Sequence, residues 1–139
     1  MAATSDERPE LTGGRDAPDA AETEIRTALG RYGDDLELFA DLAAIFPDDA
    51  RRLLENAEKG VATGDAAKVR AAAHDLKSLS ATVGGSAASR TAAGLEQMGR
   101  AGTLEGSREA LERLKVEVAA LSAALFSTVE RMRHEGPPR

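Results

Sequence analysis

Cysteine is absent from this sequence, and histidine occurs only twice. Without cysteine, the chain has no disulfide framework, no cysteine-based metal site and no thiol nucleophile. Two histidines cannot form a multi-histidine metal centre. A di-iron bundle needs inward Glu-x-x-His pairs, whereas Ala71 stands three residues before His74 and Arg131 three residues before His134. We therefore expect neither a metal nor another cofactor in this chain.

Long apolar runs and nucleotide-binding loops are also missing. The sequence has no run of about 18 apolar residues, the length needed to span a membrane. Acids at Asp6 and Glu7, with no apolar segment beside them, do not resemble a secretory signal. We therefore expect a cytoplasmic protein without a membrane partner. Neither G-x-x-x-x-G-K-[ST] nor a strand-borne G-x-G-x-x-G occurs, which argues against a nucleotide-consuming enzyme.

Positive charge and aromatic side chains are scarce. The formal net charge is −6, and the sequence shows no basic patch. The aromatic residues are Tyr32, Phe39, Phe46 and Phe126. Nucleic-acid binding relies on cations for the phosphates and on rings that stack with bases. We therefore expect no nucleic-acid partner.

Alanine, by contrast, is abundant: it accounts for 28 of the 139 residues, against five prolines. Apolar residues recur at the three- and four-residue steps of a helix in successive segments. The longest such pattern runs from Leu111 to Met132 and forms one continuous apolar seam. Helices with one apolar face, joined by short loops, bury those faces most simply against one another. The sequence therefore predicts an all-α fold, an up-and-down antiparallel four-helix bundle with a short extra N-terminal helix.

Turn residues set the expected boundaries. We expect a disordered acidic tail over residues 1–21, the bundle over 22–133 and a C-terminal tail over 134–139. One helix should span about 66–83, with Asp65 as its N-cap, and Ser86 should cap the next. Pro47 should either end or kink the helix in which it falls, and the acids that follow it suit a new helix N-terminus.

His74 is the most informative residue of the predicted 66–83 helix. At 100° per residue, the apolar residues of this segment form one face, and His74 lies about 160° from Leu76 at its centre. The ring should therefore point to water. Arg70 and Lys77 lie within reach of it. The other neighbours one or two turns away are small, namely Ala71, Ser78 and Ala81.

This arrangement suits phosphoryl transfer. Neutral imidazole is a nucleophile near physiological pH. A phosphoryl group on the ring would be doubly negative or nearly so, and Arg70 and Lys77 could compensate that charge. Small neighbours would let the active site of another protein reach the ring. His134, near the C-terminal end of the last helix, has no comparable setting and would at most favour the helix dipole when protonated.

The run Ala-His74-Asp-Leu76-Lys77-Ser78-Leu-Ser80-Ala-Thr-Val-Gly84-Gly85 resembles the histidine-containing phosphotransfer (HPt) domain family of two-component phosphorelays. The family pattern is Ala-His-x-Leu-Lys-Gly-Ser-x-x-x-x-Gly-Ala. The upstream Gly64-Asp65, the downstream Leu95-Glu96, and Gly33-Asp34 with the segment 36–46 extend the similarity over about residues 22–132. Ser78 replaces the usual glycine and Gly85 a small residue, and both remain small.

The resemblance implies that His74 is the phosphoryl acceptor and donor and that Lys77 assists the phosphoryl group. Arg70 as a second assisting cation follows from the helix geometry alone.

The implied partners are response-regulator receiver domains and a hybrid or sensor histidine kinase, and the approach surface would be Ala71, Ser78 and Ala81. The implied Mg²⁺ belongs to the receiver. We expect a phosphoryl carrier rather than an autonomous kinase, and a monomer. A non-catalytic helical adaptor, which binds a receiver or another helical partner through the same face, stays open as an alternative.

Overall fold

The structure, a computed structural model, describes residues 19–135 and consists of five helices joined by short turns. They are α2 (Ala20–Gly30), α3 (Leu36–Thr63), α4 (Ala66–Thr82), α5 (Ser86–Ala101) and α6 (Ser107–Glu135). The described residues contain no strand. The predicted all-α fold, with four long helices and a short N-terminal one, is confirmed.

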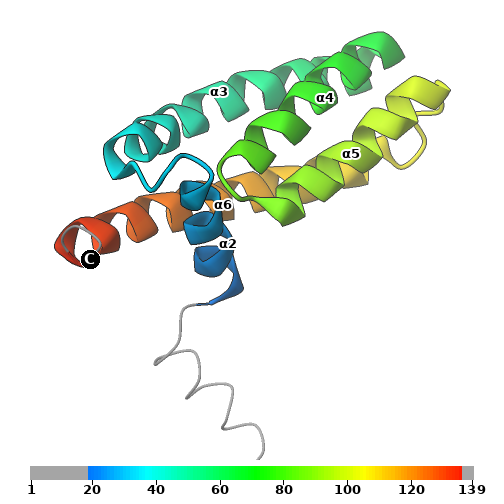
Figure 1. Cartoon of the computed structure of the whole chain (residues 1–139). Coiled ribbons are helices and arrows are strands. Elements are labelled where there is room, and N and C mark those ends of the chain that lie inside the picture. The colour runs from blue at the N-terminus through cyan, green and yellow to red at the C-terminus, as the bar shows by residue number, and fades with distance from the viewer. Residues whose placement is uncertain (1–18, 136–139) are drawn as a thin grey trace, which may run out of the picture.

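The four long helices form an antiparallel bundle in which neighbours in sequence are neighbours in space. Each of α3, α4 and α5 packs against the next helix, and α6 closes the ring against α3 and α5 (Figure 1). The most extensive packing joins α4 to α5. The outer faces of α4 and α6 therefore lie on opposite sides of the bundle.

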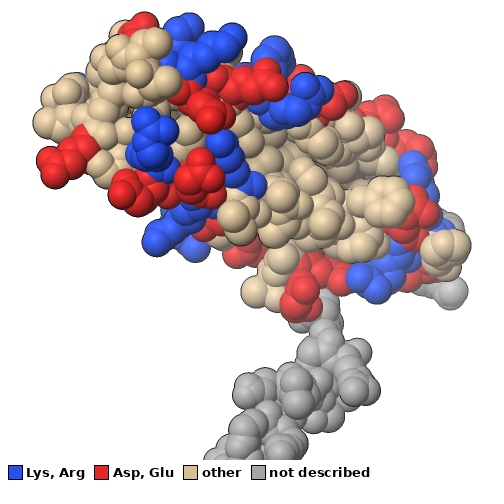
Figure 2. Space-filling view, turned by 180° about the vertical axis from the view of Figure 1, so that it is seen from behind, with Lys and Arg blue, Asp and Glu red and all other residues tan. Residues whose placement is uncertain are grey.

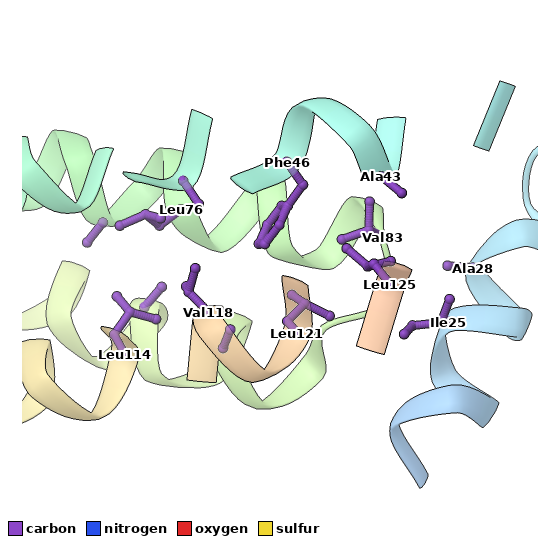
Figure 3. Packing of buried hydrophobic residues seen from close by; sticks show 14 of the residues in the cluster. Ile25, Ala28, Ala43, Phe46, Leu76, Val83, Leu114, Val118, Leu121 and Leu125 are labelled. Carbon is purple, nitrogen blue, oxygen red and sulfur yellow. The ribbon is translucent and has the colours of Figure 1, made fainter. Parts of the chain in front are cut away.

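The core runs along the bundle axis and is closed at one end by α2. Leu76 and Phe46 face Leu114, Val118 and Leu121 across the middle of the bundle (Figure 3). Burial of one such Leu or Phe side chain contributes about 1.5–3 kcal/mol relative to an exposed one. The largest fully buried side chains include Ile25, Phe39, Phe46, Leu76, Leu95, Leu111, Leu114 and Leu125.

Polar contacts and apolar packing together hold α2 in place. Ile25 is fully buried at the end of the bundle (Figure 3). The Ser86 hydroxyl donates a hydrogen bond to Glu24 Oε2 at 2.7 Å, and the Tyr32 hydroxyl donates to the carbonyl of Thr82 at 3.2 Å. These contacts tie α2 and the turn after it to the start of α5 and the end of α4.

Several predicted helix ends are confirmed, and others shift. Asp65 caps α4, because its Oδ1 accepts the backbone N–H of Lys68 at 3.1 Å. Ser86 does not cap α5: the cap residue is Gly85, which makes no side-chain capping bond, and the Ser86 hydroxyl binds Glu24 instead. Helix α2 begins at Ala20 because Asp19 accepts the N–H of Glu22, two residues before the expected boundary. The rest of the expected acidic tail, and residues 136–139, lie outside the described residues.

Pro47 does not end its helix, so of the two outcomes expected from the sequence, an end or a kink, the end with a new helix start at Asp48 is wrong. One helix, α3, runs through Pro47 without interruption. A proline inside a helix removes one backbone hydrogen bond and costs about 3 kcal/mol. Phe46 and Ala50, on either side of it, are fully buried, while Pro47 itself is exposed. Tertiary packing of the two flanking turns therefore outweighs the local cost.

The packing of α4 on α5 depends on small residues. A methyl group at Gly99 would lie 2.7 Å from the backbone nitrogen of Arg70 and 2.9 Å from the carbonyl oxygen of Ala66. Both atoms belong to the α4 backbone, which cannot move aside as a flexible side chain can. Glycine at position 99 therefore sets the separation of the two helices.

We predict that Gly99→Ala destabilises the protein by about 1–3 kcal/mol, because the added methyl forces α4 and α5 apart. Gly94→Ala is the matched control on the same helix, since no heavy atom lies within 4 Å of a methyl group there. It should instead stabilise by up to about 1 kcal/mol through helix propensity. Urea denaturation of the two variants measures both changes. Equal effects would show that the close approach at Gly99 is unimportant.

Candidate functional site at His74

The His74 ring lies on the outer face of α4, on the side nearer α5. Buried residues of α4 such as Val69, Ala73 and Leu76 define the opposite face. The His74 side chain is 57% exposed. The helix periodicity in the sequence therefore gave the correct orientation for this ring.

Glu96, on α5, holds the inner edge of the ring. His74 Nδ1 lies 2.9 Å from Glu96 Oε2. The Glu96 side chain is only 6% exposed, although it carries a charge. A buried carboxylate is costly unless it is paired and hydrogen-bonded.

Three cationic or potentially cationic groups satisfy this carboxylate. Lys77 Nζ lies 2.8 Å from Glu96 Oε1, and an Arg100 guanidinium nitrogen lies 3.1 Å from Oε2, the oxygen that also contacts His74. The hydrogen bonds from Lys77 and then from His74 lower the pKa of Glu96 to about 2, against the opposing effect of burial. Glu96 is therefore ionised at physiological pH.

An ionised Glu96 fixes which nitrogen of the ring is available. A carboxylate accepts hydrogen bonds and cannot donate them, so Nδ1 of His74 must carry the proton in this contact. In the neutral ring the other nitrogen, Nε2, then has an unshared electron pair. Because the ring is exposed, Nε2 is the atom that can attack an electrophile brought by another molecule.

The surface around the ring has low relief. Ala71, Ser78 and Ala81 are all exposed, and their role as an approach surface stays a prediction. On one side of His74 a shallow groove of about 340 Å³ runs between α4 and α5. Arg70 and Arg100 are among its lining residues, so two cations border the groove next to the ring.

The cations predicted from the sequence occupy different positions. Arg70 is exposed and borders the groove beside His74. Lys77 directs its ammonium group at Glu96, so one of its three N–H donors is already engaged there. The assisting role of either residue toward a phosphoryl group stays a prediction.

Sequence reasoning missed the two residues on α5. The sequence points to Glu96 only as part of a Leu-Glu pair within the family resemblance, and it does not point to Arg100. Because both lie more than 20 residues from His74 in sequence, helix periodicity within α4 cannot reveal them. The one available signal was the acid in an otherwise small or apolar stretch of α5, since a charged residue at such a position requires a partner.

His134 lies far from this site in sequence and in the fold. It is exposed in the last turn of α6. Within residues 19–135, no three metal-binding side chains of the histidine, cysteine or acidic types lie together. Across the same residues, no helix combines the length and apolar character that a membrane crossing requires.

Comparison with known protein families places this site in context. The family model of the Hpt domain matches residues 41–124, which is more than half of the chain and extends from α3 into α6. The chain therefore belongs to the Hpt domain family, whose members act in two-component phosphorelays. No match was found among curated proteins or among solved structures.

The lowered pKa of Glu96 predicts a specific pH dependence of stability. In the unfolded chain the carboxyl titrates near 4.5, and in the folded protein near 2. Its ion pairs therefore stabilise the fold fully above about pH 4.5, and this contribution is lost as the pH falls toward 2. This contribution to the free energy of unfolding is on the order of 1–2 kcal/mol. It is modest because Lys77 and His74 are partly exposed, so water screens their interaction with Glu96.

Urea denaturation between pH 7 and pH 3 tests this prediction. Wild type should lose more stability on acidification than Glu96→Gln, because the amide has no charge to neutralise. Glu105→Gln changes an exposed acid in the α5–α6 turn and should leave the wild-type pH profile intact. A Glu96→Gln profile parallel to that of wild type would contradict the assignment.

Proposed function

We propose that this protein relays phosphoryl groups between receiver domains through Nε2 of His74. The observation that supports the proposal is the exposed imidazole whose inner nitrogen is held by the ionised, buried Glu96. Membership of the Hpt domain family points to the same chemistry.

In the proposed step, the lone pair of Nε2 attacks the phosphorus of an aspartyl phosphate on a receiver domain. The N–P bond forms, the O–P bond of the acyl phosphate breaks, and the receiver aspartate leaves as a carboxylate. Attack places positive charge on the ring, and the Glu96 carboxylate at 2.9 Å from Nδ1 balances it. The reverse sequence, with the aspartate of a second receiver as nucleophile, regenerates neutral His74.

The cations next to the ring suit the charge of the phosphoryl group. Lys77 has two N–H donors beyond the one directed at Glu96. Arg70 and Arg100 border the adjoining groove. We propose that Lys77 and Arg70 stabilise the phosphoryl oxygens, and that the receiver supplies Mg²⁺. Positioning and charge compensation are what phosphoryl transfer mainly requires of a protein.

Transfer of radioactive phosphate from a phosphorylated receiver tests the proposal. The wild-type protein should acquire an acid-labile label, as a phosphohistidine does, and His74→Gln should acquire none. His134→Gln removes the only other histidine and serves as the matched control, with labelling like that of wild type. An unlabelled wild type that still binds the receiver would support the adaptor alternative. Equal labelling of His74→Gln would also overturn the proposal.

The approach surface gives a second prediction. Ser78 is exposed on α4, one turn after His74. A tryptophan there would keep the receiver from the ring, so Ser78→Trp should slow transfer by about tenfold or more without loss of stability. Ala62→Trp, at an exposed position near the end of α3, is the control and should transfer at the wild-type rate. Equal rates for both variants, measured by rapid-quench kinetics, would show that the receiver approaches elsewhere.

A further inference from the structure

The outer face of α6 carries an aromatic side chain that the relay does not explain. Phe126 is 71% exposed, whereas Phe39 and Phe46 are fully buried. It borders a groove of about 340 Å³ between α3 and α6, whose lining includes Ala44, Pro47 and Val129. This groove lies across the bundle from the His74 site, because α4 and α6 occupy opposite positions in the ring.

The middle of α6 has no charged residue on any side. From Val118 to Val129 every side chain is apolar, a hydroxyl or alanine, although charged residues are frequent on both flanks. Figure 2, which views the molecule from behind where α6 lies, shows an uncharged stretch with basic and acidic side chains toward both ends. An uncharged surface with a charged border is typical of protein–protein contacts.

The residues around Phe126 form a stripe that is complementary to itself. On the helix they lie within about 60° of Phe126. Between Glu112 and Arg133, the exposed or partly exposed members of the stripe are, in chain order, Glu112, Lys115, Ala119, Ser122, Ala123, Phe126, Glu130 and Arg133.

When two copies of this stripe run antiparallel about a two-fold axis between Ser122 and Ala123, opposite charges meet at both ends. Lys115 of one copy faces Glu130 of the other, and Glu112 faces Arg133. In the middle, the large Phe126 faces the small Ala119. Both the charges and the sizes of the side chains are therefore complementary under the same rotation.

The charged residues at the ends of the stripe already form ion pairs within each protomer, including pairs with α3. Lys115 Nζ lies 3.1 Å from Glu58 and 3.2 Å from Glu112, and Arg133 lies 3.4 Å from Glu130 and 3.7 Å from Glu37. In the antiparallel arrangement each end brings together two acids and two bases of the stripe, beside Glu58 and Glu37 of α3. Arg131 and Glu135 of α6 form ion pairs with α2, and both residues point well away from the stripe.

We propose that this protein forms a symmetric homodimer through the Phe126 face of α6 and the adjoining groove. The stripe is about 30 Å long and one helix wide, so the interface is small and the dimer dissociates on dilution. Both His74 sites stay accessible, because each lies on the side of its protomer away from the contact. The proposal departs from the monomer expected from the sequence, and it does not depend on the relay function.

Sedimentation equilibrium of the full chain tests the proposal between about 10 μM and about 1 mM, where weak interfaces form. Wild type should shift from the protomer mass of 14.5 kDa toward twice that value as the concentration rises. Phe126→Ser should weaken the association by about tenfold or more, because it removes the central anchor. Ile45→Ser removes another exposed apolar side chain, on a face of α3 away from the groove, and should associate like wild type.

Charge reversal tests the antiparallel register itself. Among the residues of the stripe, Lys115→Glu leaves three acids and one base at each end, and it also removes the ion pair of Lys115 with Glu58. This variant should weaken the dimer. Adding Glu130→Lys to the same chain should restore it, because acids of one copy then face bases of the other. Three results would overturn the proposal: a wild type that stays monomeric at every concentration, equal weakening by Phe126→Ser and Ile45→Ser, or no recovery in the charge-swapped double variant. Circular dichroism of each variant verifies that the bundle is intact.

Discussion

The buried carboxylate of Glu96 is the interaction on which the site depends. It lies between α4 and α5, and it contacts His74, Lys77 and Arg100 within 3.1 Å. Without a carboxylate there, the exposed imidazole would be free to rotate and to exchange its proton between two nitrogens. With it, the ring has one orientation and one available nitrogen. The same contacts keep Glu96 ionised, so the site is organised before any partner arrives.

That carboxylate reaches the ring only because α4 and α5 pack closely. Gly99 lies against the α4 backbone, and alanines such as Ala73 and Ala92 occupy buried positions on the two helices. Larger side chains would increase the helix separation and lengthen the contact between Glu96 and His74. The abundance of alanine in this sequence therefore has a functional consequence as well as a structural one.

The two opposite faces of the bundle differ in chemistry. The α4–α5 face presents a polar ring, cations and small side chains, which suits repeated, short-lived contact with a partner. The α6 face presents an exposed phenylalanine, an uncharged middle and charges at both ends. Because α4 and α6 are diagonal in the bundle, occupation of one face leaves the other open. The proposed transfer site and the proposed association surface can therefore be occupied together without competition between them.

The sequence by itself determined the helical class, the number of long helices and the exposure of His74. Each of these follows from a three- to four-residue periodicity within a single segment. The exposure of His74, for example, follows from the apolar periodicity of its own helix. Local rules were less successful at Pro47 and Ser86, because packing of Phe46 and Ala50 overrides the proline and Glu24 captures the serine hydroxyl. Only the tertiary structure brought Glu96 to His74. This contact depends on the rotation and separation of α5 relative to α4, which periodicity within a single helix does not specify.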